Sequence, residues 1–197
     1  MKRWFFAGVV AVFFFGSLFA QSKEWKLDRN HSAVSFTIKH MVISEVTGRF
    51  DDFDIKLVSS KDDFSDAMLD GTIKVESIDT GNPNRDRHLK TDDFFNAEKF
   101  PEIRFKSTSV EKVDEKNYKI TGDLTIRDVT KKVTWDAVLN GTLKSARGTR
   151  AAWKATLPIN RFDYGLKWDR VTEAGGLVAG DVVTITIVGE FVSASGT

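Results

Sequence analysis

Alternation of apolar and polar residues is the feature that most constrains the fold of this 197-residue chain. In residues 33–39, apolar Val34, Phe36 and Ile38 alternate with polar residues. Successive side chains of a β-strand point to opposite faces, so this period of two predicts a strand with one buried face. The same pattern recurs at residues 46–58, 70–75, 103–110, 118–126, 132–139, 151–158 and 181–192.

Turn-forming residues separate these runs. They lie at residues 28–30, 59–63, 114–117, 140–141 and 175–176, and the run 46–58 is expected to bend at Asp51-Asp52. Two stretches do not alternate. Residues 84–89 follow Pro83 and predict a short helical turn with Asn82 or Asn84 as its cap. Residues 161–168 predict a loop or a single turn.

About eight antiparallel strands, each apolar on one face, must bury those faces together. Closing the sheet into a barrel does this and also removes the exposed edges. An eight-stranded barrel has an interior that side chains fill or that holds one slim ligand. A sandwich of two sheets would show the same alternation. We therefore predict an all-β domain and favour a single eight-stranded antiparallel barrel over the sandwich.

The N-terminus has the pattern of a secretory signal. Lys2 and Arg3 precede an apolar run that ends at Ala20, and this run is shorter than the ~20 residues that a membrane-spanning helix needs. We expect cleavage near Ala20, residues 1–20 as signal peptide, residues 21–197 as one domain, and a periplasmic or secreted location. An uncleaved N-terminal anchor is the alternative. The chain has no cysteine, which excludes disulfides and an acylated cysteine.

Charge and motif content exclude several classes of function. Without Lys2 and Arg3, 27 basic residues face 28 acidic ones, whereas nucleic-acid binders carry a basic excess. The histidines, His31, His40 and His88, do not have metal-ligand spacing, although His31 and His40 flank one strand and could meet in space. No G-x-S-x-G motif is present. We therefore predict neither a metal, nor a cofactor, nor an enzyme.

The stretch from Asn84 to Asn96 carries the densest charge, and its reading stays open. It is either a surface helical turn in which Asp86 pairs with Lys90, or the mouth of a cavity at which Arg85 and His88 donate hydrogen bonds. In the first reading Leu89, Phe94 and Phe95 hold the turn down.

A series of short motifs runs through nearly all of the chain after residue 20. It comprises Trp25-Lys26-Leu27-Asp28, His31-Ser32 with Phe36 and His40, Gly48-Arg49-Phe50, Ser77-Ile78-Asp79-Thr80, Arg85-Asp86-Arg87-His88-Leu89, Asp93-Phe94-Phe95-Asn96, Phe100-Pro101-Glu102-Ile103-Arg104-Phe105, Gly122-Asp123-Leu124-Thr125-Ile126, Asn160-Arg161-Phe162-Asp163-Tyr164-Gly165, and Val178 with Asp181-Val182-Val183. Each motif is weak alone, but their order resembles that of the YceI-like family of polyisoprenoid-binding proteins. Arg127-Asp128-Val129 departs from it, since the family often has a histidine-glycine or similar turn there.

The resemblance implies an exported, lipocalin-like barrel that binds an isoprenoid or another lipid-like molecule in an apolar channel. The turn 85–89 would then form the rim of that channel. A transient membrane contact and a homodimer are further expectations. The in-facing residues proposed as the lining, each of which could equally be packed core, are Phe36, Ile38, Phe50, Phe105, Leu124, Trp135, Trp153, Ile185 and Ile187. The proposed head-group residues are Arg85, His88, Arg161 and Tyr164.

Two other functions remain open at this point. One is a hydrolase of an exported lipid or glycan that uses His88 or His31 with Asp86. The other is a structural or stress-response partner whose barrel is packed solid.

Overall fold

The computed structural model describes residues 22–146, 148–173 and 175–193, so the predicted signal peptide lies outside the described residues. The strands are β1 (Lys23–Leu27), β2 (Ala33–His40), β3 (Ser44–Phe50), β4 (Phe53–Ser59), β5 (Met68–Lys74), β6 (Ile78–Asp79), β7 (Glu102–Lys112), β8 (Asn117–Ile126), β9 (Val129–Ser145), β10 (Gly148–Asn160) and β11 (Ala179–Ser193). The helical elements are α1 (Pro83–Leu89) and the single turns η1 (Arg29–His31), η2 (Val75–Ser77) and η3 (Arg161–Tyr164).

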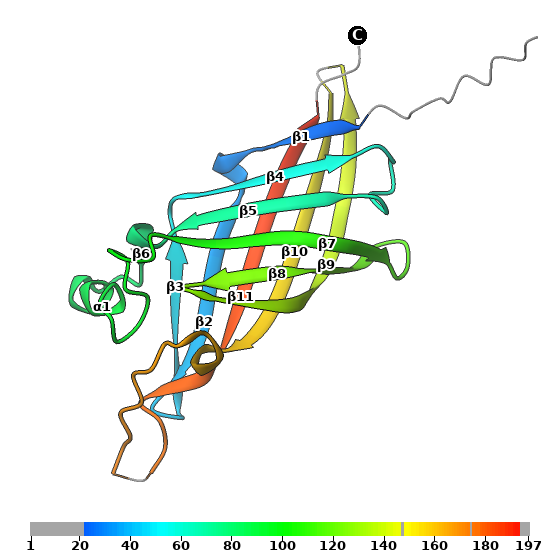
Figure 1. The fold of residues 1–197 in the computed structure, drawn as a ribbon. Helices are drawn as coiled ribbons and strands as arrows, with labels where there is room; N and C mark the ends of the chain where they lie inside the picture. The colour runs from blue at the N-terminus through cyan, green and yellow to red at the C-terminus, as the bar shows by residue number, and fades with distance from the viewer. Residues whose placement is uncertain (1–21, 147, 174, 194–197) are drawn as a thin grey trace, which may run out of the picture.

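The strands close into one antiparallel barrel (Figure 1). β1 and β2 pair with successive parts of β11, and β4 and β3 pair in turn with β1 and β2. Each of these two pairs, β1 with β2 and β3 with β4, therefore acts as one bent strand. Together with β5, β7, β8, β9, β10 and β11, these two bent strands make eight strand positions around the barrel, which we call staves. The predicted barrel is confirmed, as is the bend at Asp51-Asp52, and the sandwich is set aside.

The short helix α1 begins where the sequence predicts it. The Asn82 side chain accepts hydrogen bonds from the backbone N–H groups of Asn84 and Arg85, at 3.0 and 3.2 Å. Pro83 occupies the first turn, where a missing N–H costs nothing. No helix within the described ranges is long and apolar enough to cross a membrane.

Two local predictions are wrong, and one strand was missed. The strand β1 was not expected, because Trp25 is its only fully buried residue and charged residues surround it. Asn140-Gly141 is not a turn: β9 continues to Ser145, and the register shift between Leu139 and Gly141 leaves Asn140 as the extra residue of a β-bulge. His31 and His40 do not meet, because they flank opposite ends of β2.

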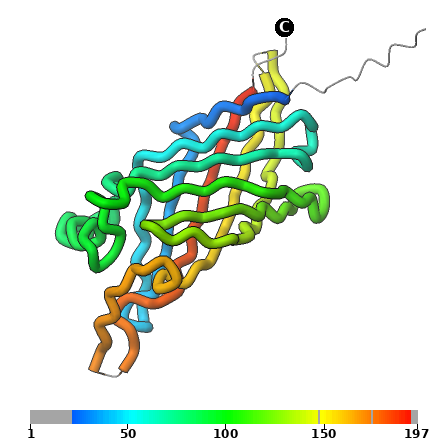
Figure 2. Tube along the Cα trace, viewed as in Figure 1, coloured from blue at the N-terminus to red at the C-terminus, as the bar shows by residue number. Residues whose placement is uncertain are grey.

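The connections gather at two ends of the barrel, as the tube in Figure 2 shows. The β4–β5, β7–β8 and β9–β10 connections share one end. The β2–β3 connection, the segment with α1, the β8–β9 turn and the segment between η3 and β11 share the other. We call this second end the mouth end.

Candidate ligand cavity

The barrel encloses an apolar cavity of about 310 Å³, a size within the range of small-molecule sites. Alternate residues of each long strand supply its wall, as the period of two requires. All nine residues proposed from the sequence lie on this wall: Phe36, Ile38, Phe50, Phe105, Leu124, Trp135, Trp153, Ile185 and Ile187. Their contact with a ligand stays a prediction.

An aromatic plug closes the end of the cavity away from the mouth. Phe64 comes from the β4–β5 connection, and its ring centroid lies 4.9 Å from that of Trp25 and 5.2 Å from that of Trp153. Tyr118 packs against Trp153 at 4.8 Å, and its hydroxyl donates to the carbonyl oxygen of Asp63 at 2.8 Å. Phe64 was not among the predicted site residues, although a lone phenylalanine within a polar stretch was a signal for it.

The carboxylate of Asp66 holds the connection that carries Phe64. It accepts hydrogen bonds from the Ser59 hydroxyl at 2.6 Å and from the backbone N–H groups of Ser60 and Lys61 at 3.0 and 3.2 Å. Burial raises the pKa of this carboxyl, but the hydrogen bonds from Ser59, Ser60 and Lys61 together outweigh burial. The net pKa is well below that of an ordinary aspartate.

Glycine is needed at one point of the wall. A Cβ at Gly48 would lie 2.3 Å from the ring of Phe36 and 2.8 Å from the Thr80 methyl group. The absence of a side chain at Gly48 thus lets Phe36 lie flat on β3, next to Phe50, with ring centroids 5.7 Å apart.

At the mouth end, α1 presents Arg85 to the cavity. Its Nε donates to the Thr80 hydroxyl at 2.7 Å and its Nη2 to the Thr80 carbonyl at 2.8 Å. No carboxylate of the described residues forms an ion pair with this guanidinium. The predicted pair of Asp86 with Lys90 is not formed, since Asp86 accepts from Thr80 and Lys90 pairs with Glu76 at 2.9 Å.

His88 also lies on the wall near the mouth. Its Nε2 lies 2.8 Å from a carboxylate oxygen of Asp93, and its ring stands edge-on to Phe94 and Trp168, at centroid distances of 5.1 and 5.8 Å. The histidine is therefore part of an aromatic rim with one charged partner. Trp168 is a rim residue that was not predicted from the sequence, because its segment lacks the alternation of apolar and polar residues that marks a strand.

Arg161 lies on the wall too, but three of its N–H donors are already used. Its side chain is buried, with the residue only 2% exposed, and it donates to the carbonyl oxygens of Gly180, Leu166 and Ala179 at 2.7, 2.8 and 3.0 Å. Burial lowers the pKa of its guanidinium. These bonds fasten η3 to the start of β11, which is a structural task.

The fourth residue proposed for the head group, Tyr164, is not on the cavity wall. It is 2% exposed, and its hydroxyl has no hydrogen-bond partner among the described residues. Burial, with a smaller contribution from the charge of Asp163, raises the pKa of Tyr164 to about 12.

Arg127, where the chain departs from the family pattern, ties the mouth together. It lies in the two-residue turn between β8 and β9 with a positive φ of 57°. Its Nη1 donates to the carbonyls of Phe94 and Gly165 at 2.8 and 3.0 Å, and its Nη2 to a carboxylate oxygen of Asp92 at 2.7 Å. The side chain thus joins the segment after α1 to the end of η3. No sequence motif pointed to it.

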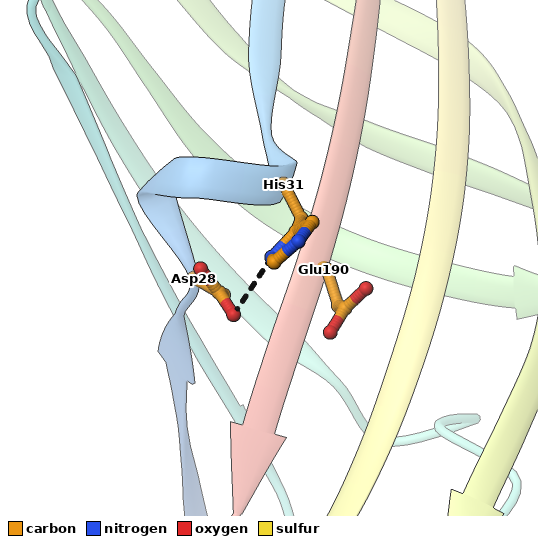
Figure 3. Close-up of side chains that lie close together, drawn as sticks. All are labelled: Asp28, His31 and Glu190. Carbon is orange, nitrogen blue, oxygen red and sulfur yellow. Dashed lines mark hydrogen bonds and ion pairs between the residues drawn. The ribbon is translucent and has the colours of Figure 1, made fainter.

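A second cluster of polar side chains is drawn in Figure 3, and none of its residues lines the cavity. Asp28, His31 and Glu190 bring potential metal-ligand atoms within 4.8 Å of one another. However, Arg150 donates to Asp28 at 3.0 Å and also to Glu190, and Arg150, followed by His31, lowers the pKa of Asp28. The guanidinium already pairs with both carboxylates and would repel a cation, so we interpret the cluster as an ion-pair network.

The His–Asp pairs of the hydrolase hypothesis are not assembled. His88 contacts Asp93, His31 contacts Asp28 at 3.1 Å, and Asp86 is bonded to Thr80. What the described residues do bring together is an apolar cavity, closed at one end and bordered by polar and aromatic groups at the other.

Comparison with known proteins identifies relatives over nearly the whole described chain. The family described as YceI-like domain matches residues 25–191. A UPF0312 protein of Staphylococcus aureus (strain N315) is 37% identical over 166 residues, which cover 83% of this chain and 94% of that protein.

Solved structures show the same fold. A crystal structure of the Campylobacter jejuni YCEI protein matches with a TM-score of 0.69 and 33% identity, over 80% of this chain and 91% of that one. A polyisoprenoid binding domain from Saccharophagus degradans, implicated in plant cell wall breakdown, matches with a TM-score of 0.61 and 18% identity, over 86% of this chain and 98% of that one.

Proposed function

Because the chain belongs to the YceI-like domain family, we propose that it is an exported protein that binds and carries a polyisoprenoid or another long-chain amphiphile inside its barrel. The observation that carries this proposal is the continuous apolar cavity with a single polar border. The shared fold of the polyisoprenoid binding domain from S. degradans supports the same ligand class. The basic and apolar pattern of residues 1–20 supports export.

The cavity fits such a ligand energetically. Burying a methylene group contributes about 0.8 kcal/mol, so ten enclosed methylenes supply roughly 8 kcal/mol before ordering costs. A tail somewhat longer than this reaches micromolar affinity without any polar contact. The polar groups at the border then determine orientation, with the tail toward Phe64 and the head group at the mouth.

The head group would lie beside Arg85 and His88. Arg85 is half-buried and has no ion-pair partner among the described residues, so an anionic oxygen would supply the missing countercharge. An amphiphile with an acidic head, such as a prenyl phosphate, is therefore the preferred ligand.

The test is extraction of the purified protein. The chain is isolated from cells, denatured and extracted with organic solvent, and the extract is analysed by mass spectrometry. We expect a stoichiometric long-chain amphiphile. Ala155→Phe, which adds a ring on the cavity wall, should yield a folded protein with an empty extract. Lys154→Phe adds the same ring at an exposed position of the same strand and should keep the ligand.

Two results would contradict the proposal. One is an empty extract from the unaltered protein together with no binding of an added prenyl alcohol. The other is equal ligand content in the two phenylalanine variants, which would place the amphiphile outside the barrel.

A further inference from the structure

The mouth end carries large apolar side chains that nothing in the described chain covers. At the β2–β3 connection Met41, Val42 and Ile43 are 47%, 66% and 88% exposed, and Val171 in the neighbouring segment is 59% exposed. We call these four residues the apolar tip. Ile43 is the most exposed large apolar residue among those described. Such clusters on a soluble domain mark contact sites.

The four residues belong to one surface. The backbone N–H of Met41 donates to the carbonyl of Val178 at 2.8 Å. Val171 and Leu177 form an isolated β-bridge that closes the segment between η3 and β11, which we call the second segment. A Cβ at Gly176 would lie 2.6 Å from a Val42 methyl group, which shows how closely the two segments approach. Figures 1 and 2 show both at the end of the barrel opposite the C-terminal end of β11.

The backbone conformation of the tip is energetically unfavourable for Met41 and Val42. Met41 and Val42 have φ values of 50° and 69°, in the left-handed region that favours Gly and Asn. A β-branched residue there is an outlier, and these two side chains are largely in water rather than in a core. Neither local conformation nor packing explains apolar residues at these positions, so a contact outside the chain is the remaining explanation.

The tip adjoins the cavity directly. Lys39, His40 and Val46, on the strands that flank the connection, lie on the cavity wall, as do Val178 and Ala179 at the start of β11. Residues 44–48 of β3 have β2 as their only strand partner among the described residues, because β6 pairs with Arg49 and Phe50 alone. An amphiphile that leaves a surface touched by the tip therefore enters the cavity without crossing open water.

The charges around the tip are balanced. Lys39 forms an ion pair with Glu45 at 2.7 Å. The second segment contains two basic residues, Lys167 and Arg170, and two acidic ones, Asp169 and Glu173. A polybasic patch for anionic lipid is thus absent from these two segments. Four side chains are also too few for a stable protein interface, which buries about 800 Å² per partner. A small neutral apolar tip fits the interfacial layer of a bilayer instead.

We propose that the apolar tip inserts into the interfacial layer of a lipid bilayer and places the cavity mouth against the membrane, so that the carried amphiphile passes between bilayer and barrel. This inference rests on the proposed function for the identity of the cargo. The membrane contact itself stands on the tip alone, and the two are tested separately.

The first measurement is co-sedimentation of the chain without its first 20 residues with phosphatidylcholine vesicles. We expect binding that 0.5 M salt does not weaken, because no net charge contributes to it. Ile43→Ser should weaken the partitioning about tenfold. Leu143→Ser is the matched control: Leu143 is 66% exposed but lies on β9 near the opposite end, so its loss should leave partitioning unchanged.

A second variant guards against unfolding. Replacing Met41 by Asn and Val42 by Gly installs residues suited to positive φ, so this double variant should melt at a higher temperature than the unaltered chain while binding vesicles more weakly. Loss of vesicle binding in a more stable protein cannot come from misfolding.

The second measurement separates docking from ligand binding. Geranylgeraniol is offered either free at low concentration or within vesicles, and quenching of tryptophan fluorescence reports its arrival. Ile43→Ser should keep the affinity for free geranylgeraniol and take it up several-fold more slowly from vesicles. If the unaltered protein binds vesicles but not geranylgeraniol, the proposed cargo is wrong and the membrane contact stands.

Three vesicle-binding results would overturn the inference. They are no binding to phosphatidylcholine vesicles, binding only to anionic vesicles in low salt, and equal losses for Ile43→Ser and Leu143→Ser. A dimer in solution that Ile43→Ser converts to a monomer would also overturn it, since the tip would then contact a second copy.

Discussion

Two buried tyrosines use their hydroxyl groups differently, although both are 2% exposed. The Tyr118 hydroxyl donates to the carbonyl of Asp63, whereas that of Tyr164 has no partner among the described residues. A buried polar group without a hydrogen bond contributes only its desolvation cost. Tyr118→Phe should therefore lower the free energy of unfolding by about 1 kcal/mol, while Tyr164→Phe should leave it unchanged or raise it. Urea denaturation of both variants checks this, and a greater loss for Tyr164→Phe would contradict it.

Arg85 and Arg161 were indistinguishable in the sequence, where both were candidates for the head group. The structure separates them, because three backbone carbonyls receive the donors of Arg161 and only Thr80 receives those of Arg85. Which donors a buried arginine has left depends on loops that are distant in sequence, so a motif could not show it. The same holds for Arg127, whose role depends on the segments around Asp92 and Gly165.

This difference predicts opposite phenotypes. Arg161→Met should lower the free energy of unfolding by about 2–4 kcal/mol, because it leaves buried carbonyls without donors. Arg85→Gln should fold with nearly unchanged stability but bind geranylgeranyl phosphate about tenfold more weakly, with little change for geranylgeraniol. Thermal melts and fluorescence titrations measure both effects. An equal loss of the alcohol and the phosphate would remove Arg85 from the head-group site.

Among the elements, the long strands were predictable and the plug was not. A period of two is a local property, and it located the eight staves of the barrel. The position of Phe64 depends instead on how the β4–β5 connection folds back under Trp25 and Trp153. The predicted turn at Asn140 was wrong for the same reason. Asn-Gly suits a turn and a bulge equally, and only the pairing of β9 with β10 determines which of the two forms.

Asp66 gives the plug an expected dependence on pH. Its pKa is lowered in the folded protein, so its contribution to stability is complete above the ordinary aspartate value near 4 and is lost as the pH falls through the lowered value. Asp66→Asn should cost about 1–3 kcal/mol at pH 7, because the amide loses charge-assisted hydrogen bonds from Ser59 and Ser60.

The difference between Asp66→Asn and the unaltered protein should shrink as the pH is lowered below about 4, since the Asp66 carboxyl of the unfolded chain takes up a proton there while that of the folded protein stays charged to lower pH. Urea denaturation at pH 7, 5 and 3 measures this. The comparison between variants matters, because Asp28, Glu102 and other carboxyls with lowered pKa values act in the same direction in both proteins. A difference that stays constant across this range would show that the charge of Asp66 does not hold the connection.

For the whole molecule, the alternation of residues determined that the sheet has an inside, but not whether that inside is full. A side chain on the inner face of a barrel looks the same in sequence whether it packs against another side chain or lines a cavity. The outcome depends on the summed volume of side chains from all eight staves, together with the plug and the mouth. Small residues such as Ala137 and Ala155, paired across β9 and β10, leave room that larger ones would fill.

A cavity of this kind couples ligand binding to the stability of the whole barrel. A ligand that binds only the folded state at 100 times its Kd adds about 2.7 kcal/mol to the free energy of unfolding. For a domain of this size that corresponds to a rise in Tm of roughly 5–10 °C. Geranylgeranyl phosphate added to ligand-free protein should produce this rise in a calorimetric scan, Lys154→Phe should reproduce it, and Ala155→Phe should show none. An equal shift in Ala155→Phe would mean that the amphiphile stabilises the protein from its surface, because the added ring lies on the cavity wall where the ligand would have to pass.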